Sequence, residues 1–245
     1  MWSDTQSINR AAVIIAAIAL IALSWCMLSW AGNKSYFAIR QVKVVSPLTE
    51  VDHGLLESAI RTELRGTFFS VAPNRVRVSL KKLPWVREVS IKRRWPMALE
   101  VGIEEYRAVG YWGENDLLSD RGEVFRAASK APMPRFEGPV AAAPDVLKRY
   151  GEAKLALASH GLDIRAFAMS PRGAITVTTG NGVSLDFGRE FFQERLNRFV
   201  ALYSSWPPSY RSNLARIDLR YKAAVAVARA GSLTPLPLEI QKGQS

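Results

Sequence analysis

The sequence predicts an α+β protein that follows a single transmembrane helix. Three observations support this fold class. The segment Ala11–Trp30 contains twenty residues without a charge. Beyond it, apolar residues recur at helical spacing in some segments and alternate with polar residues in others, as in half-buried strands. The length of 245 residues and the hydrophobic share of 48% allow one large folded domain or two small ones.

The apolar segment is predicted to be a membrane anchor over residues 11–31, after a short cytoplasmic tail, 1–10. Twenty helical residues at about 1.5 Å each span a hydrocarbon core of roughly 30 Å. A buried core helix rarely runs so far without a charge. A cleaved signal peptide is the better alternative, because Ser29 and Ala31 are small, but the apolar core of a signal is ordinarily only ~7–15 residues long. We therefore expect a retained anchor.

The side of the membrane on which the rest of the chain lies is not fixed by charge. Arg10 precedes the span, whereas Lys34, Arg40 and Lys43 follow it. Taken literally, the positive-inside rule would keep the C-terminal part in the cytoplasm, but the rule is weak for a long folded domain. Export is the favoured of the two orientations. Cys26, the only cysteine, lies in the span, so no intramolecular disulfide can form and the redox compartment stays open.

Residues 36–105 are expected to form a unit of strand, helix, helix, strand and strand. Phe37–Ser46 is rich in Val and Ile, as strands are. A T-x-x-D capping box at Thr49 and Asp52 predicts the start of a helix, and a shorter helix is predicted over about 73–84. Such a unit packs its two helices on one face of a small three-stranded sheet.

The last two strands of this unit enclose a basic run between two Trp-Pro neighbourhoods. Residues 89–91 and 99–103 alternate apolar and polar side chains, as strands of a hairpin do. Trp95-Pro96 marks the turn of the hairpin, and Trp85 follows the proline that ends the second helix. We expect both indoles to be corner pieces that bury apolar area, while the prolines block continuation of the preceding element.

The net charge of +11 allows several classes of partner. Solvated helix and strand faces are the simplest interpretation, and contact with anionic lipid or an acidic partner is the second. Nucleic acid is disfavoured because no aromatic stacking motif accompanies the charges. The basic residues in question are Arg75, Arg77, Lys81, Lys82, Arg87, Lys92, Arg93 and Arg94.

Residues 106–230 are expected to form a mostly antiparallel β domain with two packed helices. Glycine-containing turns at 120–122 and 180–182 predict two hairpins, and apolar spacing predicts helices over about 146–157 and 192–203. Alternation from Ala215 to Gly231 predicts one C-terminal strand. The Pro-punctuated residues 231–245 are expected to be a flexible tail.

The sequence contains no recognisable catalytic or metal-binding constellation. His53 and His160 are the only histidines and lie over a hundred residues apart, so no metal site is expected. Glu104 and Glu105 point to opposite faces of a strand, and the G-x-G at 180–182 lacks the third glycine of a dinucleotide loop. We expect no catalytic residue, no cofactor, no small-molecule substrate and no enzymatic activity.

The C-terminal strand is the sharper candidate for binding. A last strand is often a sheet edge with unpaired N–H and C=O groups. Small residues on its exposed face, Ala224, Ala226 and Ala228, would let another backbone approach. Strand addition would supply main-chain hydrogen bonds, and pockets for side chains would supply specificity. The alternative is that this is simply the last structural strand, protected by its own tail.

The sequence resembles the bacterial cell-division family FtsQ/DivIB. The string LPWVREVSIKRRWPMALEVGIEEYRAVGYW, residues 83–112, follows an F-x-I…V-x-V strand and precedes LLSDRGEVF. The resemblance covers most of the chain. It implies a short cytoplasmic tail, one inner-membrane anchor, a POTRA domain, and a distal β domain, with both domains in the periplasm and enriched at the division septum. Other POTRA proteins usually carry several copies or a membrane barrel, and neither is found here.

The resemblance also implies partners. It implies that the distal domain binds FtsB, which travels with FtsL, by strand addition at the last strand, and that other divisome proteins meet the POTRA domain. Arg172 and Arg220 would pair with partner carboxylates, and Tyr221 would be an amphipathic anchor. A Trp found late in this strand in some relatives is Arg229 here. The implied binding residues are Arg172, Arg220, Tyr221, Lys222, Ala223, Ala224, Val225, Ala226, Val227, Ala228 and Arg229.

The function expected from these features is that of a non-enzymatic divisome scaffold that links early and late division proteins and septal wall synthesis. The first alternative is a POTRA-type export or assembly chaperone that binds unfolded β segments by transient edge pairing. The second is a basic, membrane-tethered nucleic-acid binder. Partner selectivity separates the scaffold from the chaperone, and retention of DNA at physiological salt would favour the third interpretation.

Overall fold

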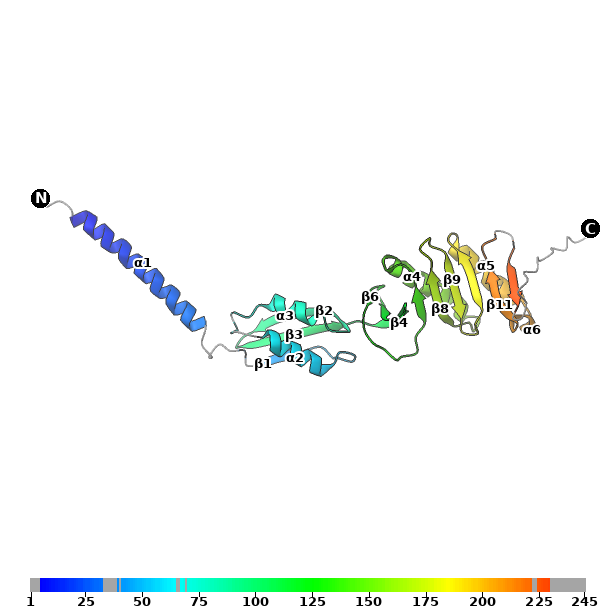
Figure 1. The fold of residues 1–245 in the computed structure, drawn as a ribbon, viewed down its shortest axis with the longest axis horizontal. Coiled ribbons are helices and arrows are strands. Elements are labelled where there is room, and N and C mark those ends of the chain that lie inside the picture. The colour runs from blue at the N-terminus through cyan, green and yellow to red at the C-terminus, as the bar shows by residue number, and fades with distance from the viewer. Residues whose placement is uncertain are drawn as a thin grey trace, which may run out of the picture. The chain divides into compact units, whose positions relative to one another are not determined.

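The computed structural model describes residues 5–32, 39, 41–64, 67–68, 70–221 and 224–229. The chain divides into two compact units, residues 1–105 and 106–245. The first carries the N-terminal helix and a three-stranded sheet, and the second carries a nine-stranded sheet (Figure 1).

The N-terminal helix α1, Thr5–Gly32, contains the candidate membrane span. Its window Ala12–Ser29 has a mean hydropathy of 2.5 and no charged residue. The described apolar side chains of the window are exposed, and Trp25 is 77% exposed. The hydroxyl of Ser29 donates to the carbonyl of Cys26 at 2.9 Å, so this polar group is satisfied within the helix. A helix that is apolar on all sides suits lipid.

The three-stranded sheet and its helices follow the predicted order. Strand β3 is central, with β1 parallel to it on one side and β2 antiparallel on the other. Of the strand predicted over residues 37–46, the structure describes 41–44 as strand, while 37, 38 and 40 lie outside the described residues. The elements are β1 Gln41–Val44, α2 His53–Glu63, α3 Pro73–Leu80, β2 Val86–Arg94 and β3 Ala98–Glu105.

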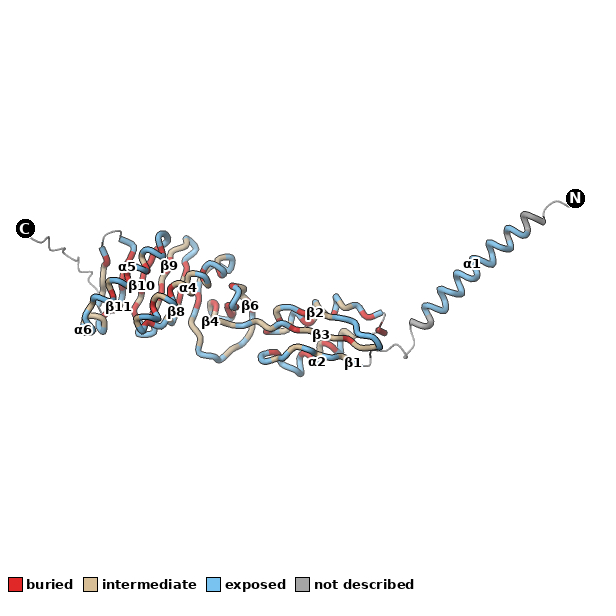
Figure 2. Tube along the Cα trace, turned by 180° about the vertical axis from the view of Figure 1, so that it is seen from behind, coloured by how far each residue is buried: buried red, intermediate tan, exposed pale blue. Residues whose placement is uncertain are grey.

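One small core holds this unit together. The two helices pack against each other, and α3 packs against β2. Figure 2 shows buried positions alternating with intermediate ones along β3, the central strand. The buried apolar residues of these elements include Leu56, Ile60, Val76, Leu80, Val89, Leu99, Val101 and Ile103.

The start of α2 differs from the predicted capping box. Asp52 is itself the N-cap, and its carboxylate accepts from the N–H groups of Gly54 at 2.7 Å and Leu55 at 3.1 Å. The N–H of Thr49 donates instead to Oε2 of Glu105 at 3.0 Å. A carboxylate from the end of β3 therefore replaces the local reciprocal bond that the motif predicts.

The two tryptophans of the Trp-Pro neighbourhoods have opposite environments. Trp85 is 9% exposed and packs at the junction between α3 and β2, as predicted. Trp95 is 83% exposed, so its prediction as a buried corner piece was wrong. It lies in the turn at 95–97 between β2 and β3, beyond the reach of the core that begins at Leu99.

The second unit is built on one long sheet. Its strand order is β12-β11-β10-β9-β8-β7-β4-β5-β6. Neighbouring strands are antiparallel except β4/β7, β7/β8 and β10/β11, which are parallel. The strands are β4 Ala108–Trp112, β5 Asp116–Ser119, β6 Val124–Phe125, β7 Arg135–Glu137, β8 Ile164–Met169, β9 Ile175–Thr179, β10 Ser184–Gly188, β11 Leu214–Asp218 and β12 Ala226–Arg229.

Two long helices cover this sheet and share its core. Val146 and Leu157 of α4 and Leu196 and Phe199 of α5 are at most 1% exposed and belong to one apolar cluster with the strands. Helix α5 also forms the crossover between the parallel strands β10 and β11. The helical elements are the short 3₁₀ turn η2 Val140–Ala142, α4 Ala143–Ala158, α5 Phe192–Ser205 and α6 Pro208–Arg211.

The single C-terminal strand predicted from Ala215 to Gly231 is two strands in the structure. β11 and β12 pair antiparallel, with Asp218 opposite Ala226. The chain therefore reverses through residues 219–225. This segment, LRYKAAV, contains no Gly, Pro or Asn to mark a turn, and apolar alternation on both sides of it imitates one continuous strand.

We predict that Glu105→Ala destabilises the first unit by about 1–3 kcal/mol, because three backbone donors lose their acceptor. Besides Thr49, the N–H groups of Glu50 and Val51 donate to Oε1 of Glu105 at 3.1 and 2.8 Å. Hydrogen exchange of the α2 amides measures the effect. The matched control is Glu57→Ala, which breaks an exposed pair with Arg61 on α2 and costs less than about 0.5 kcal/mol. Equal effects of the two substitutions would contradict this role of Glu105.

Candidate partner-binding edge

Strand β12, Ala226–Arg229, forms one edge of the nine-stranded sheet. β11 pairs with it on one side, and no other strand in the described part of the chain pairs with it. Antiparallel strands point their backbone groups alternately to two sides, so about half of the N–H and C=O groups of β12 face away from β11. The opposite sheet edge, β6, is only two residues long. β12 is thus the longer template for an added strand.

One side-chain face attaches β12 to its own domain. Val225, just before the strand, is 6% exposed and belongs to the core, and Val227 packs against that core. Ala226 and Ala228 alternate with them and are half-buried. They stand opposite Asp218 and Arg216 of β11. The strand is therefore fixed from one face, while no strand of the described residues covers its outer ladder.

Two arginines of α5, Arg195 and Arg198, hold the segment that precedes β12. Their guanidinium groups satisfy the backbone carbonyls of residues 219–221, where the chain leaves β11 after Asp218. Neither arginine could be predicted from the sequence, since both occupy ordinary polar positions of a helix. Arg195 donates to the carbonyl of Phe187 and, at 3.0 Å, to that of Arg220. Arg198 donates to the carbonyls of Leu219 at 2.7 Å and Tyr221 at 2.8 Å.

The structure brings Arg172 and Arg220 to the same end of the sheet as the start of β12. Arg172 is exposed in the turn between β8 and β9, and that turn lies at the end of β9 that pairs with Gly188. A Cβ added at Gly188 would lie 3.0 Å from Cγ of Arg220. Arg220 and Tyr221, expected at the start of the last strand, lie in the reversal before it.

Arg220 already has a carboxylate partner within the chain. Its Nε and Nη2 donate to the two oxygens of Asp218 at 2.9 and 2.6 Å. The hydrogen bond from Arg220 is the main reason that the pKa of Asp218 lies below its ordinary value, and the same pair raises the pKa of Arg220. Nη1 takes no part in these bonds.

The remaining predicted residues divide into three groups. Lys222 and Ala223 lie outside the described residues. Tyr221 is 55% exposed and Ala224 is exposed, so both side chains are accessible. The guanidinium of Arg229 lies 5.0 Å from the ring centroid of Tyr210 on α6, a cation–π contact that fixes the end of the strand.

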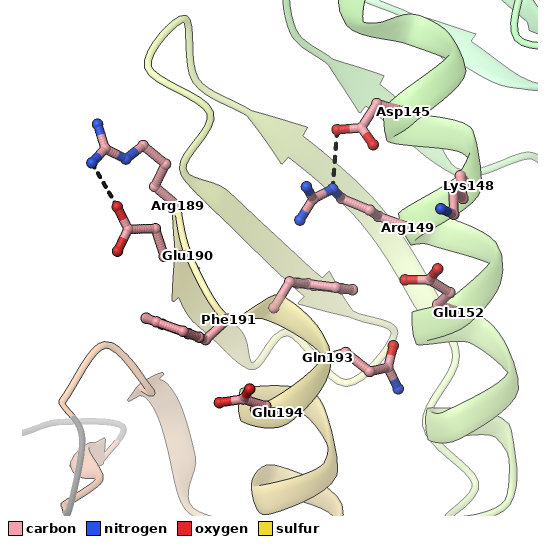
Figure 3. A pocket seen from close by; sticks show the side chains of 10 residues that line it. Asp145, Lys148, Arg149, Glu152, Arg189, Glu190, Phe191, Gln193 and Glu194 are labelled. Atoms are coloured by element: carbon pink, nitrogen blue, oxygen red, sulfur yellow. Dashed lines mark hydrogen bonds and ion pairs between the residues drawn. The ribbon is translucent and has the colours of Figure 1, made fainter.

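A separate hollow of about 550 Å³ lies between α4 and the start of α5. Figure 3 shows two ion pairs among the side chains that line it: Arg149 donates to Asp145 at 3.0 Å, and Arg189 to Glu190 at 2.7 Å. Phe191, at the rim, is 54% exposed. Both arginines of the hollow are therefore already paired with carboxylates of the chain, and the hollow is a weaker candidate than the β12 edge.

Comparison with known proteins gives two family matches that together cover most of the chain. Residues 37–106 match the POTRA domain, FtsQ-type, and residues 110–220 match Cell division protein FtsQ/DivIB, C-terminal. The second match ends before β12. The chain is 32% identical to Cell division protein FtsQ of Burkholderia pseudomallei over 94% of its length and 95% of the relative's, and 32% identical to that of Bordetella pertussis over 98% and 95%.

The chain belongs to the FtsQ/DivIB family. Its three-stranded unit is an FtsQ-type POTRA domain, and its nine-stranded unit carries the C-terminal domain of the family. FtsQ/DivIB proteins are membrane proteins of the division site and interact with other divisome proteins, so this chain takes part in cell division. The apolar helix α1 is its candidate span.

We predict that the Asp218–Arg220 pair makes the FtsQ/DivIB C-terminal domain acid-sensitive. Because the folded-state pKa of Asp218 is lowered, the stabilisation is complete above the ordinary value of 3.8 and is lost as pH falls below it, through the folded-state pKa. Melting of wild type and Asp218→Asn at decreasing pH measures this. The variant should be less stable at neutral pH and lose less stability in acid.

The control is Glu190→Gln, which neutralises an exposed carboxylate paired with the neighbouring Arg189. We expect it to melt much like wild type at neutral pH. If the melting temperature of Asp218→Asn fell with decreasing pH as steeply as that of wild type, protonation of Asp218 would not be the cause of the acid sensitivity.

Proposed function

We propose that this chain is a non-enzymatic divisome scaffold that holds FtsB, together with FtsL, by β-strand addition at β12. The proposal places both folded units in the periplasm, with the protein enriched at the septum, where it links early and late division proteins and septal wall synthesis. The observation that carries it is the position of β12 at the edge of the sheet, where β11 is its only partner strand among the described residues.

Strand addition fits the geometry of this edge. The guest backbone would take the N–H and C=O groups that face away from β11, at about 0.5–1.5 kcal/mol net per hydrogen bond. Ala226 and Ala228 leave room beside the ladder, and Val227 keeps β12 attached to the core. The edge is pre-organised, so a guest pays little for ordering it.

Cationic and aromatic groups at the start of β12 would give the edge its selectivity. Arg172 is exposed and makes no ion pair in the described part of the chain, so it can take a partner carboxylate directly. Arg220 would share its guanidinium between Asp218 and the partner. Tyr221 supplies an exposed ring with a polar tip beside them. The POTRA domain, whose sheet ends at β1 and β2, would meet other divisome proteins.

We predict that a single proline in β12 separates folding from partner capture. Ala226→Pro and Val227→Pro remove neighbouring N–H donors, which point to opposite sides of the strand. One substitution breaks the ladder to β11 and lowers the melting temperature. The other should leave the fold intact and weaken capture of a purified FtsB–FtsL complex by at least about tenfold, since a guest loses a hydrogen bond and meets the ring.

Val124→Pro in β6, at the opposite edge of the same sheet, is the matched control and should capture FtsB–FtsL normally. The full chain in detergent is used for all three variants. If the β12 proline variant that keeps its fold binds the complex as wild type does, strand addition at this edge is wrong.

We also predict that the edge is selective, which separates a scaffold from a chaperone for unfolded β segments. Unlabelled FtsB should displace bound FtsB from the full chain, whereas unrelated β-forming peptides at the same concentration should not. Displacement by many such peptides would favour the chaperone.

A further inference from the structure

The turn between β2 and β3 presents an exposed indole within a basic cluster. Trp95 is 83% exposed, although a buried tryptophan supplies one of the largest apolar areas of any residue. Lys92, Arg93 and Arg94 immediately precede it and are all exposed. An amphipathic ring beside cationic side chains is the composition that proteins place at a lipid–water interface. We name residues 92–97 the hairpin tip.

The sheet adds further positive charge beside the hairpin tip. Glu100 of β3 stands opposite Lys92 of β2 and opposite Lys43 of β1. Arg94 also donates to Glu100, at 2.5 Å. That hydrogen bond is the main reason that the pKa of Glu100 lies below its ordinary value, and the charges of Lys92 and Lys43 act in the same direction. Three cationic side chains, Lys43, Lys92 and Arg94, thus surround one carboxylate, whereas Arg93 lies opposite Leu99 and donates to the carbonyl of Val71 at 2.8 Å.

The parallel pairing of β1 with β3 puts the tip at the end of the sheet where the chain arrives from the anchor. Gln41, the first residue of β1, pairs with Ala98, the residue that follows the tip. Eight residues, 33–40, separate helix α1 from β1. Even fully extended they reach roughly 30 Å. Whatever the orientation of the helix, its membrane surface is within reach of the hairpin tip.

We propose that the hairpin tip is a second membrane contact, in which Trp95 enters the headgroup region of an anionic leaflet and Lys43, Lys92 and Arg94 meet lipid phosphates. The tether keeps the local concentration of lipid surface high, so a weak contact suffices. The contact fixes which end of the POTRA domain faces the membrane. It rests on α1 spanning a bilayer and is independent of strand addition at β12.

A depth-sensitive label on the full chain tests the contact directly. Cys26 is the only cysteine, so Cys26→Ser gives a background in which Met97→Cys takes a single fluorophore while Trp95 is kept. The protein is placed in nanodiscs of phosphatidylcholine, with or without phosphatidylglycerol, that carry a quencher at headgroup depth. We expect the label to lose fluorescence in discs that contain phosphatidylglycerol.

Leu55→Cys is the matched control within the same domain. Leu55 is 52% exposed at the start of α2. The residues just before α2 are bound to Glu105, which is the end of β3 that lies farther from the tip. A label there should stay unquenched. If Met97→Cys lowers the melting temperature, Arg94→Cys carries the label instead, since that side chain is 66% exposed. Because this variant loses one cation, its contact should be about fivefold weaker but should still depend on phosphatidylglycerol.

Two further variants, labelled in the same way, test the chemistry of the contact. Lys43→Gln with Lys92→Gln should weaken it about 25-fold, at about fivefold per cation near an anionic surface. Trp95→Ser should also reduce quenching, without a change in melting temperature. The proposal is overturned if the tip label is no more quenched than the label at 55. It is also overturned if quenching does not depend on phosphatidylglycerol or on Trp95, or if the fluorescence of the tip label changes only when a partner protein is added.

Discussion

The position of β12 depends on two arginines of α5, whose guanidinium groups bind backbone carbonyls in the segment before this strand. Arg195 and Arg198 bind the carbonyls of Leu219, Arg220 and Tyr221, and so end β11 and turn the chain back. Without these donors the same residues could continue one long strand, because their apolar alternation allows it. With them, β12 returns along β11 and becomes the edge of the sheet. The hydrogen bonds to these backbone carbonyls thus determine which strand lies at this edge of the sheet.

The sequence predicted those elements that are marked by local periodicity and turn chemistry. The two long helices of the C-terminal domain lie where their apolar spacing placed them, and the hairpin turning at 180–182 joins β9 and β10. The order of the POTRA elements was also predicted. The parallel pairs were not, because pairing between strands far apart in sequence leaves no local trace.

Three site-related predictions failed for physical reasons that sequence alone does not reveal. The reversal at 219–225 contains no turn-forming residue and is held by arginines from another element. Trp95 is exposed because the hairpin turn that carries it extends beyond the buried core of the domain. The carboxylate that binds the N–H groups before α2 comes from Glu105, more than fifty residues further along the chain. In each case a long-range partner outweighs the local motif.

We propose that β12 of this FtsQ/DivIB chain lends its outer backbone ladder to a partner. Amide hydrogen exchange of residues 226–229 in the full chain, with and without FtsB–FtsL, tests this most directly. The account predicts that alternate amides, those not bound to β11, become protected on binding, while β6 at the other edge is unchanged. Binding of the complex with no change in exchange along β12 would contradict it.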